Sequence, residues 1–205
     1  MAQLPLPLAY AADEGAASFV HAAANADAVA WLAQPPAART LLVGPPTSGK
    51  THLGRLFAER HRAMLVDDAE AVDQERLFHI WNAAAAAAPV LFTAREVPRR
   101  WVTLPDLASR LAATPTLVIG PPDEALLSAL IIKHFADRGV RLAPEVAAYT
   151  ALRIERSFAA AARVVAVLDA VALARMRQVT VPLVREVLEG QGDLLGDPAE
   201  PRLSP

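Results

Sequence analysis

The sequence predicts an α/β protein with a parallel sheet, followed by an all-helical part. Two observations carry this prediction. Short apolar runs, typical of buried parallel strands, alternate with helical segments over roughly the first 120 residues. After Pro122 the strand signals stop and only helical patterns follow. The length of 205 residues allows one domain, or one domain with a small second one.

Each expected strand has a local signal at one of its boundaries. The first run stops at Gly44, the second closes with two acids, and the fourth stops at Gly120. Pro89 ends the helix that precedes the third run, and the alanine run 83–88 is interpreted as the tightly packed end of that helix. The expected strands are 40–43, 63–68, 90–93 and 116–119; a helix is expected before the first strand, at 16–33, and two helices between strands, at 51–62 and 74–87.

The helical part has start and stop signals of its own. Asp123 and Glu124 suit a first turn, and Gly139 suits a stop. Thr180 suits an N-cap, with Pro182 in the first turn after it. The expected helices are 123–138, 144–154, 157–176 and 181–189.

The composition is that of a globular protein. Residues of the hydrophobic class make up 54% of the chain and charged residues 20%, with a net charge of −2. This charge gives no electrostatic reason to expect direct binding to DNA. The absence of cysteine excludes disulfides and thiolate metal sites and fits a cytoplasmic location. No apolar run approaches the ~20 residues of a membrane span, so no membrane contact is expected.

One loop predicts nucleotide binding. It follows an expected strand, precedes an expected helix, and matches the pattern G-x-x-x-x-G-K-[ST]. Backbone N–H groups of such a loop cradle phosphates, the lysine approaches the β- and γ-phosphates, and the threonine hydroxyl can ligate Mg²⁺. The alternative is a structural glycine turn. The loop is Gly44-Pro45-Pro46-Thr47-Ser48-Gly49-Lys50-Thr51, and the expected ligand is ADP or ATP.

The second expected strand provides acids for the same site. Asp67 is expected to hold Mg²⁺ through water, and Asp68 to polarise the attacking water. The alternative is an ordinary strand that ends in a solvated acidic turn.

Several segments together resemble the Hda and DnaA-like AAA+ family. The segment 104–111, Leu-Pro-Asp-Leu-Ala-Ser-Arg-Leu, resembles the family's arginine-finger segment. Phe19-Val20, with Asn25 and Ala28, resembles the opening of its nucleotide domain. Residues 154–169 and 180–188 resemble the Hda lid. At the start, the peptide Gln3, Leu4, Pro5, Leu6, Pro7, Leu8 resembles the clamp-binding peptide of Hda.

The resemblance implies an AAA+ fold and a regulatory role. In that family, Hda docks on the DNA-loaded polymerase sliding clamp and makes ATP-bound DnaA hydrolyse its nucleotide, which turns off replication initiation. Arg110 would be the arginine finger supplied in trans, and Asn25 would lie by the nucleotide. The implied parts are a clamp-binding peptide (1–9), a nucleotide-binding base (10–120), a helical lid (121–190) and a tail (191–205). Exposed Leu4 and Leu6 would also favour a homodimer.

Departures from the family pattern predict weak or no intrinsic ATPase activity. Arg95 stands where the family's sensor-one acid is expected, with Thr93 as a substitute polar probe of the γ-phosphate. Ala159 aligns with the lid's sensor-two arginine, and Arg156 and Arg163 lie about a turn away. About a dozen residues separate Thr51 from the second strand, so the sheet is expected to be shortened.

Other functions stay open at this level. A stand-alone ATPase would need intact sensors. A DNA-binding initiator would need a helix-turn-helix domain after the lid. A clamp-tethered relative that recruits another partner differs from the Hda-like regulator only in the role of Arg110. Surface arginine is the alternative for Arg110, and a disordered leader is the alternative for residues 3–8.

Overall fold

A computed structural model describes residues 23–32 and 34–190, so expectations for residues 3–8 and for the tail lie outside the described residues. The chain divides into two compact units between Pro121 and Pro122. We refer to the described residues up to 121 as the base and to residues 122–190 as the lid. Each unit is described by itself.

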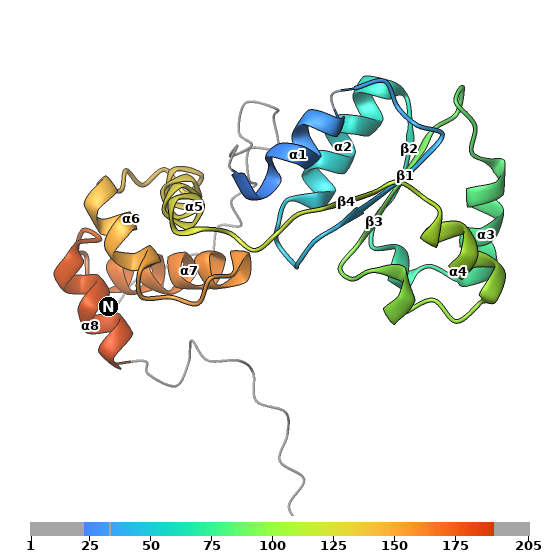
Figure 1. Ribbon diagram of the computed structural model, residues 1–205. Coiled ribbons are helices and arrows are strands. Elements are labelled where there is room, and N and C mark those ends of the chain that lie inside the picture. The colour runs from blue at the N-terminus through green and yellow to red at the C-terminus, as the bar shows by residue number, and fades with distance from the viewer. Residues whose placement is uncertain (1–22, 33, 191–205) are drawn as a thin grey trace, which may run out of the picture. The chain divides into compact units, whose positions relative to one another are not determined.

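The base is built on a parallel sheet (Figure 1). Its strands are β1 (Arg39–Val43), β2 (Met64–Val66), β3 (Val90–Ala94) and β4 (Thr116–Val118), in the order β2-β3-β1-β4. The register pairs Val43 with Ala94 and with Val118. Because parallel neighbours end at the same edge, the segments that follow β1, β2 and β3 meet there. The expected α/β class with a parallel sheet is confirmed.

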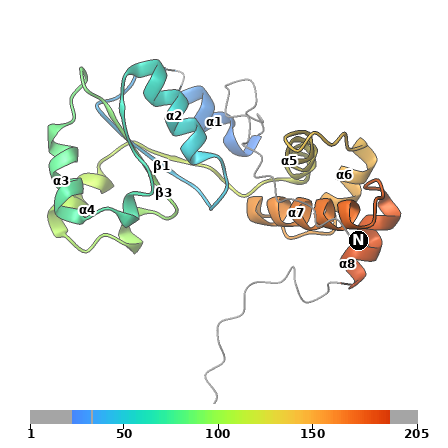
Figure 2. The same ribbon diagram turned by 180° about the vertical axis from the view of Figure 1, so that it is seen from behind.

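Helices cover both faces of this sheet. Helices α1 (Ala23–Leu32) and α2 (Lys50–His61) lie on one face, and α3 (Gln74–Ala83) and α4 (Pro105–Ala112) on the other, as Figures 1 and 2 show. Short 3-10 turns, Ala69–Ala71 (η2) and Pro98–Arg100 (η3), precede α3 and α4. Leu41, Val43 and Phe92 pack against Leu107 and Leu111 of α4, which explains why this face is apolar.

The prediction that a helix runs from 74 to 87 was wrong at its end. Helix α3 stops at Ala83, and Ala85 and Ala88 exchange backbone hydrogen bonds of 3.2 and 2.9 Å in a tight turn. Alanine has the highest helix propensity, but here a side chain from β1 competes. Arg39 donates from Nε to the Trp81 carbonyl (2.6 Å) and from Nη2 to the Ala84 carbonyl (2.8 Å), which caps the helix at this point.

Two further features of the base refine the expectation. Only residues 62 and 63 separate α2 from β2, and β2 is an edge strand of the sheet. The segment around Arg110 had no assigned secondary structure from the sequence and forms α4, which begins with Pro105 in its first turn.

The lid is a four-helix unit within the described residues. Its helices are α5 (Glu124–Ala136), α6 (Pro144–Ala151), α7 (Phe158–Ala174) and α8 (Val181–Gly190). Asp123 caps α5 by accepting a hydrogen bond from the Leu126 N–H at 2.7 Å, and Ser157 caps α7. The lid core includes Ile131, Phe135, Val164 and Leu168, all fully buried. Among the described residues, no helix is long and apolar enough to cross a membrane.

Candidate functional site: a phosphate-binding loop with an acidic edge

The loop 44–51 lies at the carboxyl edge of the sheet, between β1 and α2. Gly44 begins it, and its N–H donates to the Ala94 carbonyl of β3 at 3.1 Å. A methyl group at Gly44 would lie 2.9 Å from Ile119 Cβ and 3.0 Å from Ser48 Oγ. The backbone can therefore pass this point only without a side chain.

The loop then turns sharply into α2. Thr47 has φ 59° and Gly49 has φ 86°, both in the left-handed region, and Lys50 is the first residue of the helix. The first-turn N–H groups of a helix have no acceptor within the helix and carry its positive dipole end. This is the arrangement that binds phosphate in nucleotide-binding loops.

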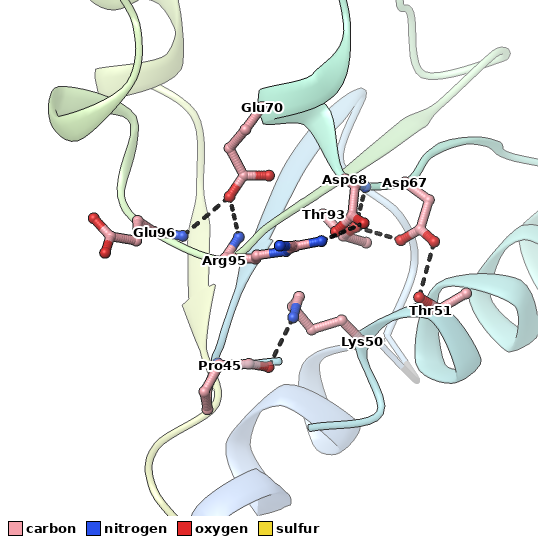
Figure 3. A network of polar contacts seen from close by, with 9 residues as sticks. All are labelled: Pro45, Lys50, Thr51, Asp67, Asp68, Glu70, Thr93, Arg95 and Glu96. Atoms are coloured by element: carbon pink, nitrogen blue, oxygen red, sulfur yellow. Dashed lines mark hydrogen bonds and ion pairs between the residues drawn. The ribbon is translucent and has the colours of Figure 1, made fainter. Parts of the chain in front are cut away.

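The Lys50 side chain is bound to the backbone of the loop (Figure 3). Its ammonium donates to the Pro45 carbonyl at 2.9 Å, and the residue is only 6% exposed. Burial lowers the pKa of Lys50, although Asp68, Glu70 and Asp67 oppose that change. A partly desolvated ammonium is stabilised by a nearby anion, and a phosphate is the anion that this loop would bind.

Asp67 lies directly after β2, and each of its carboxylate oxygens accepts a hydrogen bond from a threonine hydroxyl. Thr51 donates to Oδ2 at 2.8 Å, and Thr93 donates to Oδ1. Thr93 is fully buried, and its oxygen also accepts the Asp68 N–H at 3.0 Å. The sequence suggested Thr93 as a probe of the γ-phosphate. In this structure its hydroxyl orients the two acids, a role that the sequence did not indicate.

Asp68 faces a cation from the neighbouring strand. Arg95, the first residue after β3, places Nη2 3.1 Å from Asp68 Oδ2 (Figure 3). The side chains are 58% and 47% exposed, so water screens the pair. The Asp68 carboxylate raises the pKa of Arg95, mainly through this hydrogen bond. Asp68 itself has φ 46°, an uncommon value for a residue with a side chain.

Glu70 is a functional candidate that sequence reasoning missed. One of its carboxylate oxygens accepts the backbone N–H groups of Arg95 and Glu96. It thereby fixes the turn after β3. The sequence did contain a signal for this residue, because Glu70 is a third acid only two residues after Asp68. A hollow of about 580 Å³ lies beside the loop and is lined by Pro45, Pro46, Asp68, Glu70, Ala71, Arg95, Glu96 and Trp101.

The residues present fit a nucleotide with magnesium. The buried Ser48 Oγ has no partner among the described residues, and the cradle at Gly44 excludes a side chain. Within the described residues, no group of three or more histidine or acidic side chains could hold a metal alone. Nucleotide-bound Mg²⁺ needs only one or two protein ligands beside the phosphates, and Thr51 and Asp67 already contact each other.

Arg110 lies on α4, on the sheet face opposite α2 (Figures 1 and 2). Its guanidinium stacks over Phe78 at 4.4 Å, donates from Nε to Asn82 Oδ1 at 3.0 Å, and from Nη1 to the Asp106 carbonyl at 3.2 Å. Gln74 holds the segment before α4, because its side-chain carbonyl accepts the N–H groups of Thr103 and Leu104. Sequence reasoning missed Gln74, Phe78 and Asn82.

The remaining expected residues are less informative. Asn25 lies in α1, but its side chain is outside the described residues. In the lid, Ala159 and Arg163 are part of α7, and Arg156 precedes it. Arg163 Nη2 lies 3.8 Å from Glu155 Oε2.

Comparison with known proteins identifies the fold and the lid. Residues 123–188 match the family model of the Hda lid domain. Domain III of the DnaA replication initiation protein from Thermotoga maritima is similar in structure, with a TM-score of 0.72 and 15% identity over 87% of this chain and 96% of that one. The RuvB branch-migration motor from Thermotoga maritima is also similar, with a TM-score of 0.55 and 16% identity over 74% of this chain and 61% of that one. No curated protein matches by sequence.

These findings confirm the AAA+ fold with a helical lid, and they are consistent with the resemblance to the Hda and DnaA-like family. The structural similarity at 15% identity concerns the fold alone.

Proposed function

We propose that this chain, a DnaA-related AAA+ regulator with an Hda-type lid, binds ADP or ATP with Mg²⁺ and stimulates ATP hydrolysis by DnaA. The observation that carries the proposal is the Hda lid match over residues 123–188. This lid follows a base whose fold is similar to domain III of the DnaA replication initiation protein. The outcome would be negative regulation of replication initiation in the cytoplasm.

The bound nucleotide would be held by the loop and would serve mainly to shape the protein. Lys50 would bind the β- and γ-phosphates, while Thr51 and Asp67 would hold Mg²⁺, which neutralises phosphate charge when bound. Asn25 would contribute from α1. Intrinsic turnover is proposed to be weak, because Arg95 stands where the family's sensor-one acid is expected and Ala159 where its sensor-two arginine is expected.

Arg110 is proposed to act on the nucleotide of a neighbouring DnaA. Its helix is on the other face of the sheet from α2, which argues against action on this chain's own loop. Two N–H groups of the guanidinium bind its own chain, through Nε and Nη1. Three of the five N–H groups of an arginine then stay available for a phosphate. An arginine supplied in trans stabilises transition-state charge and is worth ~10³–10⁵ in rate.

The N-terminal peptide is proposed to bind the sliding clamp. Gln3 would fill a polar pocket, and Leu4, Leu6 and Leu8 an apolar one, with Pro5 and Pro7 keeping the peptide extended. Burial of two or three leucines, at ~1.5–3 kcal/mol each, is enough for micromolar binding after ordering costs. The same leucines could support a homodimer when no clamp is present.

The test is ATP hydrolysis by DnaA in the presence of DNA-loaded clamp. Wild-type protein should accelerate it, and Arg110→Ala should abolish the acceleration while binding to clamp persists. Arg110→Lys should recover little, because a lysine lacks the planar fork that matches phosphate oxygens. Ser109→Ala, at an exposed neighbouring position, serves as the matched control and should behave as wild type.

A double variant in the N-terminal peptide separates docking from chemistry. Gln3→Ala with Leu6→Ala should lose both clamp binding and stimulation. If the wild type binds clamp but leaves DnaA turnover unchanged, the chain is a clamp-tethered relative with another partner. If instead it hydrolyses ATP alone at ordinary enzyme rates of ~1–10³ s⁻¹, it is a stand-alone ATPase and the regulatory proposal is wrong.

A further inference from the structure

The proposed function leaves the ion pair between Asp68 and Arg95 without a role. Arg95 follows β3 directly, and Ala94 before it pairs in register with Val43, the last residue before the phosphate loop. The sheet therefore brings Arg95 to the opening of the loop. Its Nη2 lies 3.1 Å from Asp68 Oδ2, on the side of the site that Lys50 also faces (Figure 3).

The backbone at both Asp68 and Arg95 is held in place by hydrogen bonds to other side chains. Glu70 accepts the N–H groups of Arg95 and Glu96 with one oxygen, and its other oxygen is buried without a partner among the described residues. The Asp68 N–H is bound by Thr93 at 3.0 Å. The guanidinium is thus aimed at Asp68 by the turn that carries it.

In ATP hydrolysis, the Asp68 carboxylate is the group proposed to accept the proton of the attacking water. A water oxygen bonds to the γ-phosphorus, the bond from that phosphorus to the β–γ bridging oxygen breaks, and ADP leaves with that oxygen. The proton that the water loses is accepted by a carboxylate and returned to phosphate. A general base of this kind contributes ~10²–10⁴ in rate, but only if its oxygens can accept from water.

We propose that Arg95 is an internal lock that occupies the Asp68 carboxylate and holds down the chain's own ATP hydrolysis. This inference rests on the proposed nucleotide site. Arginine stays charged at all physiological pH values, so the lock does not open by deprotonation. Because about half of each side chain is exposed, water competes with the pair, and the lock is partial. Arg95 acts through Asp68, so it is a positioning residue.

The competing role for Arg95 is direct contact with the γ-phosphate. That role makes the opposite prediction, because loss of a phosphate ligand weakens ATP binding relative to ADP and slows hydrolysis. The two roles therefore differ in the sign of the effect on rate.

The experiment is single-turnover hydrolysis of ATP with Mg²⁺ by the purified full chain, without DnaA. Arg95→Ala should be at least about tenfold faster than wild type. Arg95→Lys should stay close to wild type, because an ammonium can keep the ion pair. Arg99→Ala, an exposed arginine of the same loop, is the matched control and should leave the rate unchanged.

The double variant Arg95→Ala with Asp68→Asn tests the route of the effect. Its rate should fall to the wild-type level or below, because the gain depends on a free Asp68 carboxylate. A gain that survives in the double variant would overturn the lock, and so would a slower Arg95→Ala whose affinity falls for ATP but not for ADP. Binding of fluorescent ADP by the wild type is measured alongside. Failure of that binding sinks the proposed nucleotide site itself, whereas binding with no gain in rate sinks only the lock.

Discussion

Gly44 lies where β1 ends and the phosphate loop begins, and it has no room for a side chain. The two atoms that a methyl group would meet, Ile119 Cβ at 2.9 Å and Ser48 Oγ at 3.0 Å, belong to the residue after β4 and to the loop itself. Neither is the far end of a long flexible side chain, so the backbone must shift to relieve the contact. The geometry of the loop and the packing of the sheet edge are therefore coupled at one position.

We expect Gly44→Ala to weaken nucleotide binding and to lower stability together. The free energy of unfolding should fall by about 1–3 kcal/mol, as for other overpacked positions, and ADP affinity should fall at least about tenfold. Urea denaturation and fluorescent-ADP titration measure the two effects. Gly120→Ala is the control, since a methyl group there meets nothing within 4 Å. Equal effects of both changes would contradict the argument.

At the scale of elements, α3 is defined by contacts at both ends. Asp73 caps its start by accepting the Arg76 N–H at 2.9 Å. At its end Arg39 binds two carbonyls, Trp81 and Ala84, and lies over the Trp81 ring at 4.0 Å. The end of α3 is thus determined by a strand residue about forty positions earlier in the chain.

Arg39→Met should destabilise the base by about 1.5–3 kcal/mol. The change keeps most of the side-chain volume but removes hydrogen bonds from a charged donor to half-buried carbonyls. Urea denaturation followed by tryptophan fluorescence measures the loss and also reports on Trp81. Arg76→Met, at an exposed position of the same helix, should have a near-zero effect. A comparable loss in both variants would show that the carbonyl contacts contribute nothing specific.

The same helix shows what sequence can and cannot predict. Local patterns predicted four strands, the phosphate loop and the acids after β2, because apolar runs, glycines and a lysine in fixed spacing act locally. The turn at 84–88 was missed, because six alanines favour helix and only Arg39, distant in sequence, ends it. Likewise, the sequence predicted that Arg95 follows the third strand. Its contact with Asp68 was not predicted, because it depends on the order of the strands in the sheet.

At the scale of the whole molecule, the base and the lid each have a separate apolar core. The fold is similar to that of DnaA domain III at 15% identity, and within the base only residues 62 and 63 connect α2 to β2. Under the proposed function, nucleotide bound at the phosphate loop adds to the stability of the base.

Lys50→Met should remove the stabilisation by nucleotide without destabilising the free protein. The buried ammonium is costly without an anion, as its lowered pKa indicates, so a methionine of similar volume should leave the melting temperature of the free protein unchanged or higher. Saturation of the wild type at 100 times the Kd for ADP should add about 2.7 kcal/mol to the free energy of unfolding, and the variant should gain nothing. Thermal melting with and without Mg-ADP measures both quantities. The matched control is Lys133→Met, which removes the chain's other lysine and its 2.7 Å contact with Asp137 in the lid. That variant should lose a little stability and keep the full ADP increment, whereas an increment that persists in Lys50→Met would remove the phosphate site from this loop.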